Sequence, residues 1–214
     1  MGERRPIATR ELALSRRIAA RLAAAGWTPN RISMAGMIAG LLAGLCFWLT
    51  ATLPDFARPL LLLGALLVQL RLLCNMFDGM VALETDQASP VGELYNEVPD
   101  RVSDAAALVG LGYAIGGSAT VGWAAAIAAV FTAYVRAELK VAGAPQDFCG
   151  PMAKPQRMCL VTVAALYCAV TPLAWQPMTE SGHGIPALCL LSILIGSLWT
   201  ALRRLSRGSR ALRA

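Results

Sequence analysis

Residues 75–104 of this chain read NMFDGMVALETDQASPVGELYNEVPDRVSD, with acids and amides placed between long apolar runs. Charged groups within or beside a hydrocarbon layer are energetically unfavourable, so a cluster of them next to membrane-length segments predicts a functional site. The flanking sequence decides whether those segments are membrane helices.

The composition is that of a membrane protein rather than of an ordinary soluble domain. Of the 214 residues, 57% are hydrophobic and 15% are charged, and the mean hydropathy is +0.56. Residues 32–53 carry no charged side chain and are long enough to cross a bilayer. Mainly apolar runs follow at about 59–82, 102–116, 119–137, 158–175 and 185–202. We therefore expect an all-α polytopic membrane protein with six transmembrane helices.

The length of one uncharged run places the acids on a helix. Residues 105–135 hold 31 uncharged residues, too few for two spans of about 20 residues and a turn. The third helix must then start near Pro90 and the fourth must continue to about Lys140, with a turn at 116–118. Ser89 and Pro90 suit an N-cap and a first-turn proline. The third helix thus carries its acids at the membrane interface.

Arginine and lysine give the orientation. They lie before the first helix, near the second-to-third and fourth-to-fifth connections and after the last helix, whereas the opposite side has only Arg58. By the positive-inside rule, we expect both termini to be cytoplasmic in a multi-pass inner-membrane protein. The net charge of +6 then reflects topology and contact with anionic membrane lipids, and no nucleic-acid partner is expected.

Three segments are expected along the chain. Residues 1–31 form a cytoplasmic interfacial segment, with an amphipathic helix at about 8–25 that has apolar side chains on one stripe and arginines away from it. Residues 32–205 form the six-helix transmembrane catalytic domain. Residues 206–214 form a basic cytoplasmic tail.

Polar or small residues share single faces of the second and third helices. On the second helix they are Arg71, Asn75, Asp78, Gly79 and Ala82. On the third they are Asn96, Glu97, Asp100 and Asp104, within an arc of about 100°. The connection at about 84–89 is short, so the two helices are expected to be antiparallel neighbours. Oxygen ligands from two helices suit Mg²⁺ or Mn²⁺ with substrate phosphates, although such residues can also serve only to pack membrane helices.

The spacing of these residues resembles the signature of the CDP-alcohol phosphotransferase family, D-x2-D-G-x2-A-R-x8-G-x3-D-x3-D. The matching positions here are Asn75, Asp78, Gly79, Ala82, Leu83, Gly92, Asn96 and Asp100. The segment Thr28-Pro29-Asn30-Arg31-Ile32-Ser33 is similar to the T-P-N-x-x-[TS] motif of the family, and the basic loop at 150–157 also matches.

The resemblance implies transfer of a phosphatidyl group from CDP-diacylglycerol, or another CDP-linked donor, to an alcohol acceptor, with release of CMP in phospholipid biosynthesis. It implies divalent metal held by the acids, Asp100 as the base that takes the acceptor proton, and a homodimer. Nucleotide-binding positions implied in this way are Asn30, Gly79, Ala82 and Gly92. Positions implied for the acceptor, which can be phosphorylated, are Arg136, Lys154 and Arg157.

Three positions depart from the signature: Asn75 and Asn96 replace acids, and Leu83 replaces the arginine. Each lost carboxylate removes about 8 kcal/mol of attraction for a divalent ion at about 4 Å and an effective dielectric near 20, before desolvation. Glu97 and Asp104 are candidates to restore that charge as further metal ligands. Arg71 is a possible charge partner of the acidic face.

Two other functions stay open at this point. The two asparagines also suit a catalytically impaired family member that binds a nucleotide-lipid or partners another membrane protein. A small transporter with an acidic pathway is the third hypothesis, but the acids gather at one cytoplasmic end and no matching polar residues cross the other helices.

Overall fold

The structure is a computed structural model that describes residues 13–85, 90–145, 147 and 149–213. These residues form seven α-helices and two short 3₁₀ turns. The helices are α1 (Ala13–Ala24), α2 (Pro29–Thr52), α3 (Ala57–Glu84), α4 (Pro90–Gly112), α5 (Ala119–Val141), α6 (Lys154–Val170) and α7 (Ile185–Ala211), and the turns are η2 (Pro54–Phe56) and η3 (Leu173–Trp175). The all-α prediction is confirmed.

Four segments of the described chain are long and apolar enough to cross a membrane. They are α2, η2 with α3 (Pro54–Glu84), α5 and α7. Helix α4 carries several charged residues in its first two thirds, among them Glu97, Asp100 and Asp104, and α6 has only 17 residues. Large apolar side chains nevertheless lie exposed on α4 and α6 as on the other helices. A count of six spans therefore stays a prediction.

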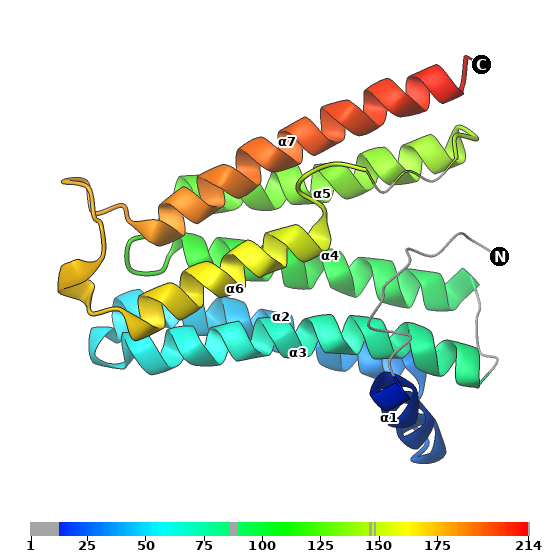
Figure 1. Ribbon diagram of the computed structural model, residues 1–214, viewed down its shortest axis with the longest axis horizontal. Coiled ribbons are helices and arrows are strands. Elements are labelled where there is room, and N and C mark those ends of the chain that lie inside the picture. Colours follow the sequence, from blue (N-terminus) through cyan, green and yellow to red (C-terminus); the bar gives the residue numbers. More distant parts are fainter. Residues whose placement is uncertain (1–12, 86–89, 146, 148, 214) are drawn as a thin grey trace.

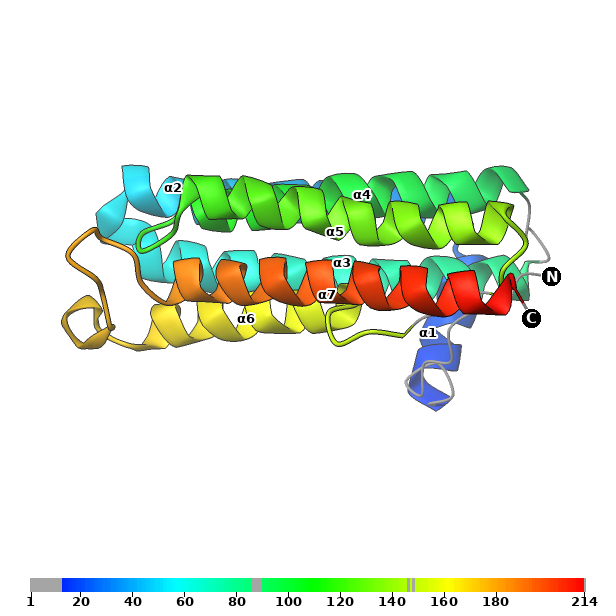
Figure 2. The ribbon, with the colours of Figure 1, turned by 90° about the horizontal axis from the view of Figure 1, so that it is seen from above.

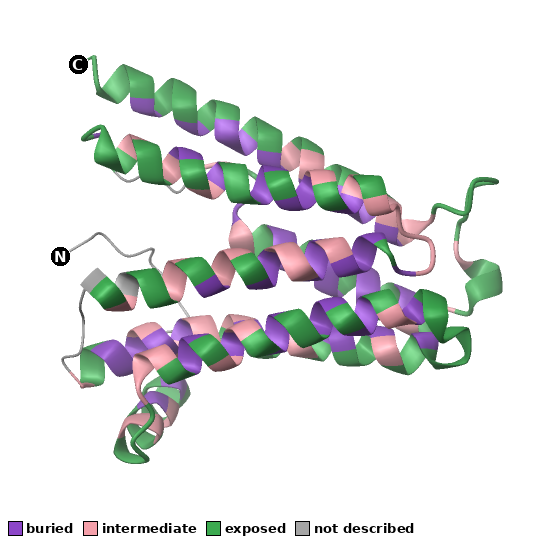
Figure 3. Cartoon of the chain, turned by 180° about the vertical axis from the view of Figure 1, so that it is seen from behind, coloured by how far each residue is buried: buried purple, intermediate pink, exposed green. Residues whose placement is uncertain are grey.

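Helices α2 to α7 run side by side along the long axis of the molecule and close into a ring (Figures 1 and 2). Around the ring, α2 packs on α3, α3 on α6, α6 on α7, α7 on α5, α5 on α4, and α4 on α2. Buried apolar side chains of all six helices fill the interior, among them Phe47, Val68, Leu108, Met158 and Leu190. In Figure 3 the long helices show exposed residues beside these buried ones, as expected for a bundle whose outer surface faces lipid.

Helix α2 approaches its neighbours closely because glycine recurs on it every four residues. A Cβ added to Gly36 would lie 2.9 Å from Cys74 Cβ of α3, and one added to Gly40 would lie 2.4 Å from Ser103 Cβ of α4. Gly44 and Gly110 face each other where α2 crosses α4. Small residues at this spacing let membrane helices pack backbone against backbone. Helix α2 therefore fixes α3 and α4 together, and α3 and α4 touch each other only briefly.

The contact between α3 and α4, which were expected to be antiparallel neighbours, covers only a short part of the two helices. The short connection brings together the end of α3 and the start of α4, but α2 supplies most of the packing surface of both helices. The two polar faces still meet, at the end of the bundle where α1 and the last turns of α7 lie (Figure 1).

Several helix ends differ from the expected boundaries. Helix α2 begins at Pro29, inside the expected interfacial segment, because the Thr28 hydroxyl caps it by accepting from the Arg31 amide at 3.4 Å. Helix α6 begins at Lys154, and α7 continues to Ala211 without a break before the expected tail.

Helix α1 covers most of the expected amphipathic segment, and residues 8–12 of that segment lie outside the described residues. Its Ala19 and Leu22 pack on Met76 and Met80 of α3. Part of its apolar stripe thus meets the bundle, whereas Leu14 is exposed. A position at the lipid interface stays a prediction for this helix.

Candidate active site

A small cavity lies between α2, α3 and α4 at the end of the bundle. Its lining residues are Ser33, Gly36, Arg71, Asn75, Asp78, Asn96 and Asp100. The sequence pattern had placed five of these on facing polar sides of two helices, and the structure brings those five together. The third helix, α2, contributes Ser33 and the small surface of Gly36.

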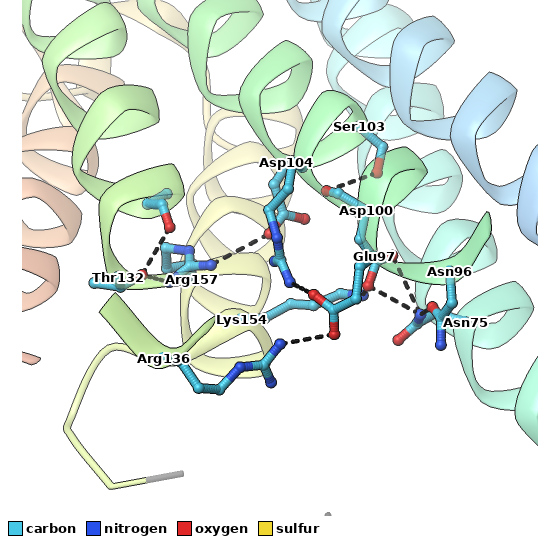
Figure 4. A network of polar contacts seen from close by, with 12 residues as sticks. Asn75, Asn96, Glu97, Asp100, Ser103, Asp104, Thr132, Arg136, Lys154 and Arg157 are labelled. Atoms are coloured by element: carbon cyan, nitrogen blue, oxygen red, sulfur yellow. Dashed lines mark hydrogen bonds and ion pairs between the residues drawn. The ribbon is translucent and has the colours of Figure 1, made fainter. Parts of the chain in front are cut away.

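Asp100 on α4 is surrounded by nitrogen donors. The Asn75 side-chain amide donates to its Oδ1 at 3.2 Å and its Oδ2 at 3.1 Å, and Arg71 Nη2 lies 3.2 Å from Oδ1. Lys154 at the start of α6 pairs with Oδ2 (Figure 4). The same Asn75 amide nitrogen donates to Asn96 Oδ1 at 2.7 Å. Asn75 therefore presents its NH₂ group, not its oxygen, to the neighbouring α4 side chains.

Asp78 has a different environment, although it lines the same cavity. Its side chain is buried, and its Oδ2 accepts a hydrogen bond of 2.7 Å from the Ser33 hydroxyl. Its Oδ1 is buried without a hydrogen-bond partner. A buried carboxylate oxygen that lacks a donor is unfavourable by itself. Asp78 is thus the lining carboxylate with a lone pair available to a ligand.

A second layer of charges lies behind the cavity. Asp104 is buried, with Oδ1 at 2.5 Å from Arg71 Nη2 and Oδ2 at 3.3 Å from Arg157 Nη2. Arg71 Nε also donates to the Ser103 hydroxyl at 3.0 Å. Arg71 is therefore the partner of Asp100 and Asp104 rather than of Asp78, and it forms one wall of the cavity.

Arg157 ties this layer to the start of α6. Its Nη1 donates to the Met152 carbonyl at 2.9 Å and lies 3.5 Å from the Thr132 hydroxyl of α5. These contacts hold the α5–α6 loop in place. In the same loop, partial burial raises the pKa of the Asp147 carboxyl, but hydrogen bonding by the Cys149 side chain and amide and the charge of Arg207 outweigh it and bring that pKa below its usual value.

A third, more exposed group forms the rim of the site. Glu97 pairs with Arg101 one turn along α4 and lies 2.7 Å from Arg136 Nη2 of α5 (Figure 4). The Glu97 side chain is 41% exposed. It points to these arginines and is not part of the cavity lining. The structure thus brings Arg136 near the site through Glu97, and places Lys154 in direct contact with Asp100.

The residues expected to bind nucleotide lie around the cavity and do not line it. Gly79 and Ala82 continue the polar face of α3 beyond Asp78, and Gly92 lies one turn before Asn96 on α4. Asn30 lies in the first turn of α2, three residues before Ser33. All four are at the same end of the bundle as the cavity.

Sequence reasoning missed three contacts that shape the site. The Ser33 hydroxyl donates to Asp78, and the Ser103 hydroxyl accepts from Arg71. The Thr132 hydroxyl lies near the Arg157 guanidinium. For Ser33 the sequence did hold a signal. Ser33 is the last residue of the T-P-N-x-x-[TS] segment, and a hydroxyl four residues into an apolar helix favours a hydrogen-bond partner inside the protein. Ser103 and Thr132 gave no comparable signal.

The donor set limits which metal could be held here. Within the described ranges, no three His, Cys, Asp or Glu side chains gather in a way that could bind a metal ion. Asp78 offers a free buried oxygen, and Asn75 and Asn96 offer amide groups beside it. Hard cations accept carboxylate and amide oxygens together. The residues present therefore fit one divalent cation at Asp78, with further ligands from a bound phosphate.

Comparison with known proteins agrees with a helical membrane enzyme that has a polar site at one end. The family model described as CDP-alcohol phosphatidyltransferase matches residues 27–195. The chain is 31% identical over 156 residues to archaetidylinositol phosphate synthase of Pyrococcus horikoshii, covering 72% of this chain and 77% of that protein. This chain therefore belongs to the CDP-alcohol phosphatidyltransferase family, whose members are enzymes of phospholipid biosynthesis.

Two further likenesses extend this result. The chain is 27% identical over 180 residues to the inner membrane protein YnbA of Escherichia coli, covering 83% of this chain and 82% of that protein. The crystal structure of Mycobacterium tuberculosis phosphatidylinositol phosphate synthase with CDP-DAG bound superimposes with a TM-score of 0.75 at 21% identity, covering 92% of this chain and 94% of that chain. The same enzyme in complex with manganese and citrate gives a TM-score of 0.74. These structures show that the fold is shared.

Proposed function

We propose that this protein transfers a phosphatidyl group from CDP-diacylglycerol to an alcohol at the cavity between α2, α3 and α4. The observation that carries the proposal is the cavity itself, where Asp78 and Asp100 from the family signature meet with one free carboxylate oxygen. The donor would enter from the membrane with its pyrophosphate at Asp78, Asn75 and Asn96. The family membership and the CDP-lipid complex of the M. tuberculosis enzyme support a CDP-linked lipid donor.

In the proposed reaction, Asp100 takes the proton of the acceptor hydroxyl. The hydroxyl oxygen forms a bond to the phosphorus of the phosphatidyl group, the bond from that phosphorus to the CMP oxygen breaks, and CMP leaves. A general base must lie within hydrogen-bond reach of the proton that it accepts. Asp100 lines the cavity, but its oxygens already accept from Asn75, Arg71 and Lys154. The acceptor hydroxyl must therefore displace one of these donors.

A divalent cation, Mg²⁺ or Mn²⁺, would be held by Asp78, beside Asn75 and Asn96, with further ligands from the pyrophosphate, whose charge it would neutralise. Ser33 fixes the Asp78 carboxylate for this purpose. Glu97 and Asp104 keep their arginine partners, so their proposed role is to position the rim and the wall of the cavity.

The acceptor would approach from the rim, where Arg136 pairs with Glu97 and Lys154 pairs with Asp100 (Figure 4), and Arg157 is buried beside Asp104. Cations in this position suit an acceptor that carries a phosphate group. Two of the relatives are named as synthases of inositol phosphate lipids, which supports an acceptor of this class. The proposed assembly is a homodimer in the inner membrane, with both termini in the cytoplasm.

Release of CMP tests the function. Purified full-length protein with CDP-diacylglycerol, Mg²⁺ or Mn²⁺ and a panel of alcohols, including phosphorylated polyols, should release CMP. Asp100→Asn should lower the rate by about 10²- to 10⁴-fold, the usual contribution of a general base. Asp55→Asn is a matched control, because Asp55 is an exposed acid of η2 at the other end of the bundle.

A second function would follow from a different result. If the wild-type protein binds CDP but releases no CMP with any acceptor, it is a nucleotide-lipid-binding protein. The saturation of Asp100 by Asn75, Arg71 and Lys154 is the observation that favours this second candidate.

A further inference from the structure

The charges around the cavity balance without a metal ion. The carboxylates are Asp78, Asp100 and Asp104, and the cations are Arg71, Lys154 and Arg157. The side chains of the four residues in the Arg71 and Lys154 ion pairs are at most 16% exposed. Because buried charges are stable only when they are compensated, a divalent ion added to this set would leave two positive charges without partners.

The amides contribute to this balance. At position 75 the Asn75 NH₂ group donates to both oxygens of Asp100 and to Asn96. An aspartate at this position could not donate and would repel Asp100. The pair Asn75–Asn96 therefore suits a site in which Asp100 is held by nitrogen donors instead of by a metal ion.

One ligand atom remains unused in the same cavity. Asp78 is 3% exposed, and its Oδ1 has no hydrogen-bond partner. The Asp78 carboxylate on α3 can therefore accept one cation. The Asp100 carboxylate on α4 is already paired with Arg71 and Lys154.

We propose that this protein takes up a single divalent cation, at Asp78, and only together with the CDP-linked donor, because Arg71 and Lys154 occupy Asp100 in place of a second cation. The proposal rests on the proposed function, since the donor pyrophosphate supplies the negative charge that the cation needs. Each pyrophosphate brings about two negative charges, which balance one divalent ion.

The test measures Mn²⁺ binding to the full-length protein in detergent, by electron paramagnetic resonance of free Mn²⁺, with and without CDP. Without CDP, Mn²⁺ should bind weakly. With saturating CDP, one Mn²⁺ per chain should bind, with an affinity higher by about 5- to 150-fold, the usual range of coupling between two ligands. Two Mn²⁺ per chain, or equal affinity with and without CDP, would overturn the inference.

Two lysine variants separate the role of Lys154 from a general loss of charge. Lys154→Met removes one cation from Asp100, so Mn²⁺ binding in the absence of CDP should become tighter by about tenfold or more. Lys140→Met removes a lysine at the exposed end of α5 and should leave Mn²⁺ binding unchanged. An equal response of the two variants would contradict the assignment of Lys154.

The outcomes distinguish this inference from the proposed function. If CDP fails to bind with Mn²⁺ present, both the function and the inference are rejected. If CDP binds and two Mn²⁺ ions bind before it, the function stands and the inference is rejected. A further variant, Asn75→Asp with Asn96→Asp, should bind Mn²⁺ without CDP because it restores two negative charges, and failure of the folded variant to do so would also contradict the inference.

Discussion

Ser33 shows how a residue outside the acidic signature can determine what the signature does. Its hydroxyl is the hydrogen-bond donor to Asp78 Oδ2, and both side chains are buried. Without the Ser33 hydroxyl, Asp78 Oδ2 would lose this hydrogen bond, and Oδ1 already lacks a partner. A hydrogen bond to a charged group contributes about 1.5–3 kcal/mol, and an unpaired buried group is more costly than an absent one.

We therefore predict that Ser33→Ala weakens binding of Mn²⁺ in the presence of CDP by about tenfold or more, since 1.4 kcal/mol is a factor of ten. Ser33→Thr keeps the hydroxyl and should bind close to the wild-type affinity. Ser192→Ala is the control, because the exposed Ser192 hydroxyl donates only to the Leu188 carbonyl of its own helix. Calorimetry measures all three, and equal losses in Ser33→Ala and Ser33→Thr would show that size rather than the hydroxyl matters.

At the scale of single residues, the sequence could predict five of the seven residues that line the cavity but not their hydrogen bonds and ion pairs. The spacing of Asn75, Asp78, Asn96 and Asp100 is enough to place them on two facing helices, because helical periodicity fixes which side chains share a face. The partner of each carboxylate depends on how far one helix slides along another. Lys154 reaches Asp100 from a helix that begins after a loop, and its charge equally suited a positive-inside marker.

At the scale of elements, apolar runs were sufficient to predict six of the helices, because a membrane span needs a minimum apolar length. Their neighbours were harder to predict. The short α3–α4 connection suggested that these two helices pack together, whereas α2 packs on both. The repeat Gly36, Gly40 and Gly44 was the available signal, since small residues at this spacing mark the closely packed face of a membrane helix.

The α2–α4 crossing gives a prediction about stability. A Cβ on Gly44 would lie 2.3 Å from the backbone oxygen of Ala106, so Gly44→Ala must push the helices apart. Overpacking of this kind costs about 1–3 kcal/mol, against a gain of about 1 kcal/mol in helix propensity. We expect a lower thermal midpoint in detergent and, because α2 carries Ser33, weaker binding of CDP with Mn²⁺.

Gly196→Ala is the matched control for this prediction. It is also a glycine in the middle of a helix, but the three atoms nearest to its added methyl group all belong to the Met152 side chain, with Cε at 2.7 Å, Cβ at 3.0 Å and Cγ at 3.3 Å, and none is a backbone atom. A side chain can shift more easily than two packed backbones, so the thermal midpoint should fall less than in Gly44→Ala. If both variants lose the same stability, backbone contact at Gly44 is not what holds α2 to α4.

At the scale of the whole molecule, the ring of α2 to α7 brings the start of α2 and the end of α7 to one end of the bundle (Figure 2). The site lies at this end, together with most of the arginines. The distribution of arginine and lysine predicts which side of the membrane this is, but the ring closure depends on packing between helices that are distant in the sequence. For that reason the order of helices around the ring could not be predicted from the sequence, and the orientation in the membrane stays a prediction.

The number of crossings can be tested by the labelling of single cysteines with a membrane-impermeant thiol reagent, in a variant whose six native cysteines are replaced and which still releases CMP. The probes are Ser118→Cys in the α4–α5 turn, Ala142→Cys after α5 and Ser181→Cys before α7. With six spans and cytoplasmic termini, positions 118 and 181 should react in intact cells and position 142 only after permeabilisation.

The same three probes separate six crossings from four. If only α2, α3, α5 and α7 crossed, position 118 would be cytoplasmic and position 142 external, whereas position 181 would be external in both cases. Position 181 therefore reports the orientation, and positions 118 and 142 report whether α4 and α6 span the membrane. Because Asp100 lies on α4 and Lys154 on α6, labelling of position 142 in intact cells would mean that these helices do not cross and that the site is not built between membrane spans at the inner surface.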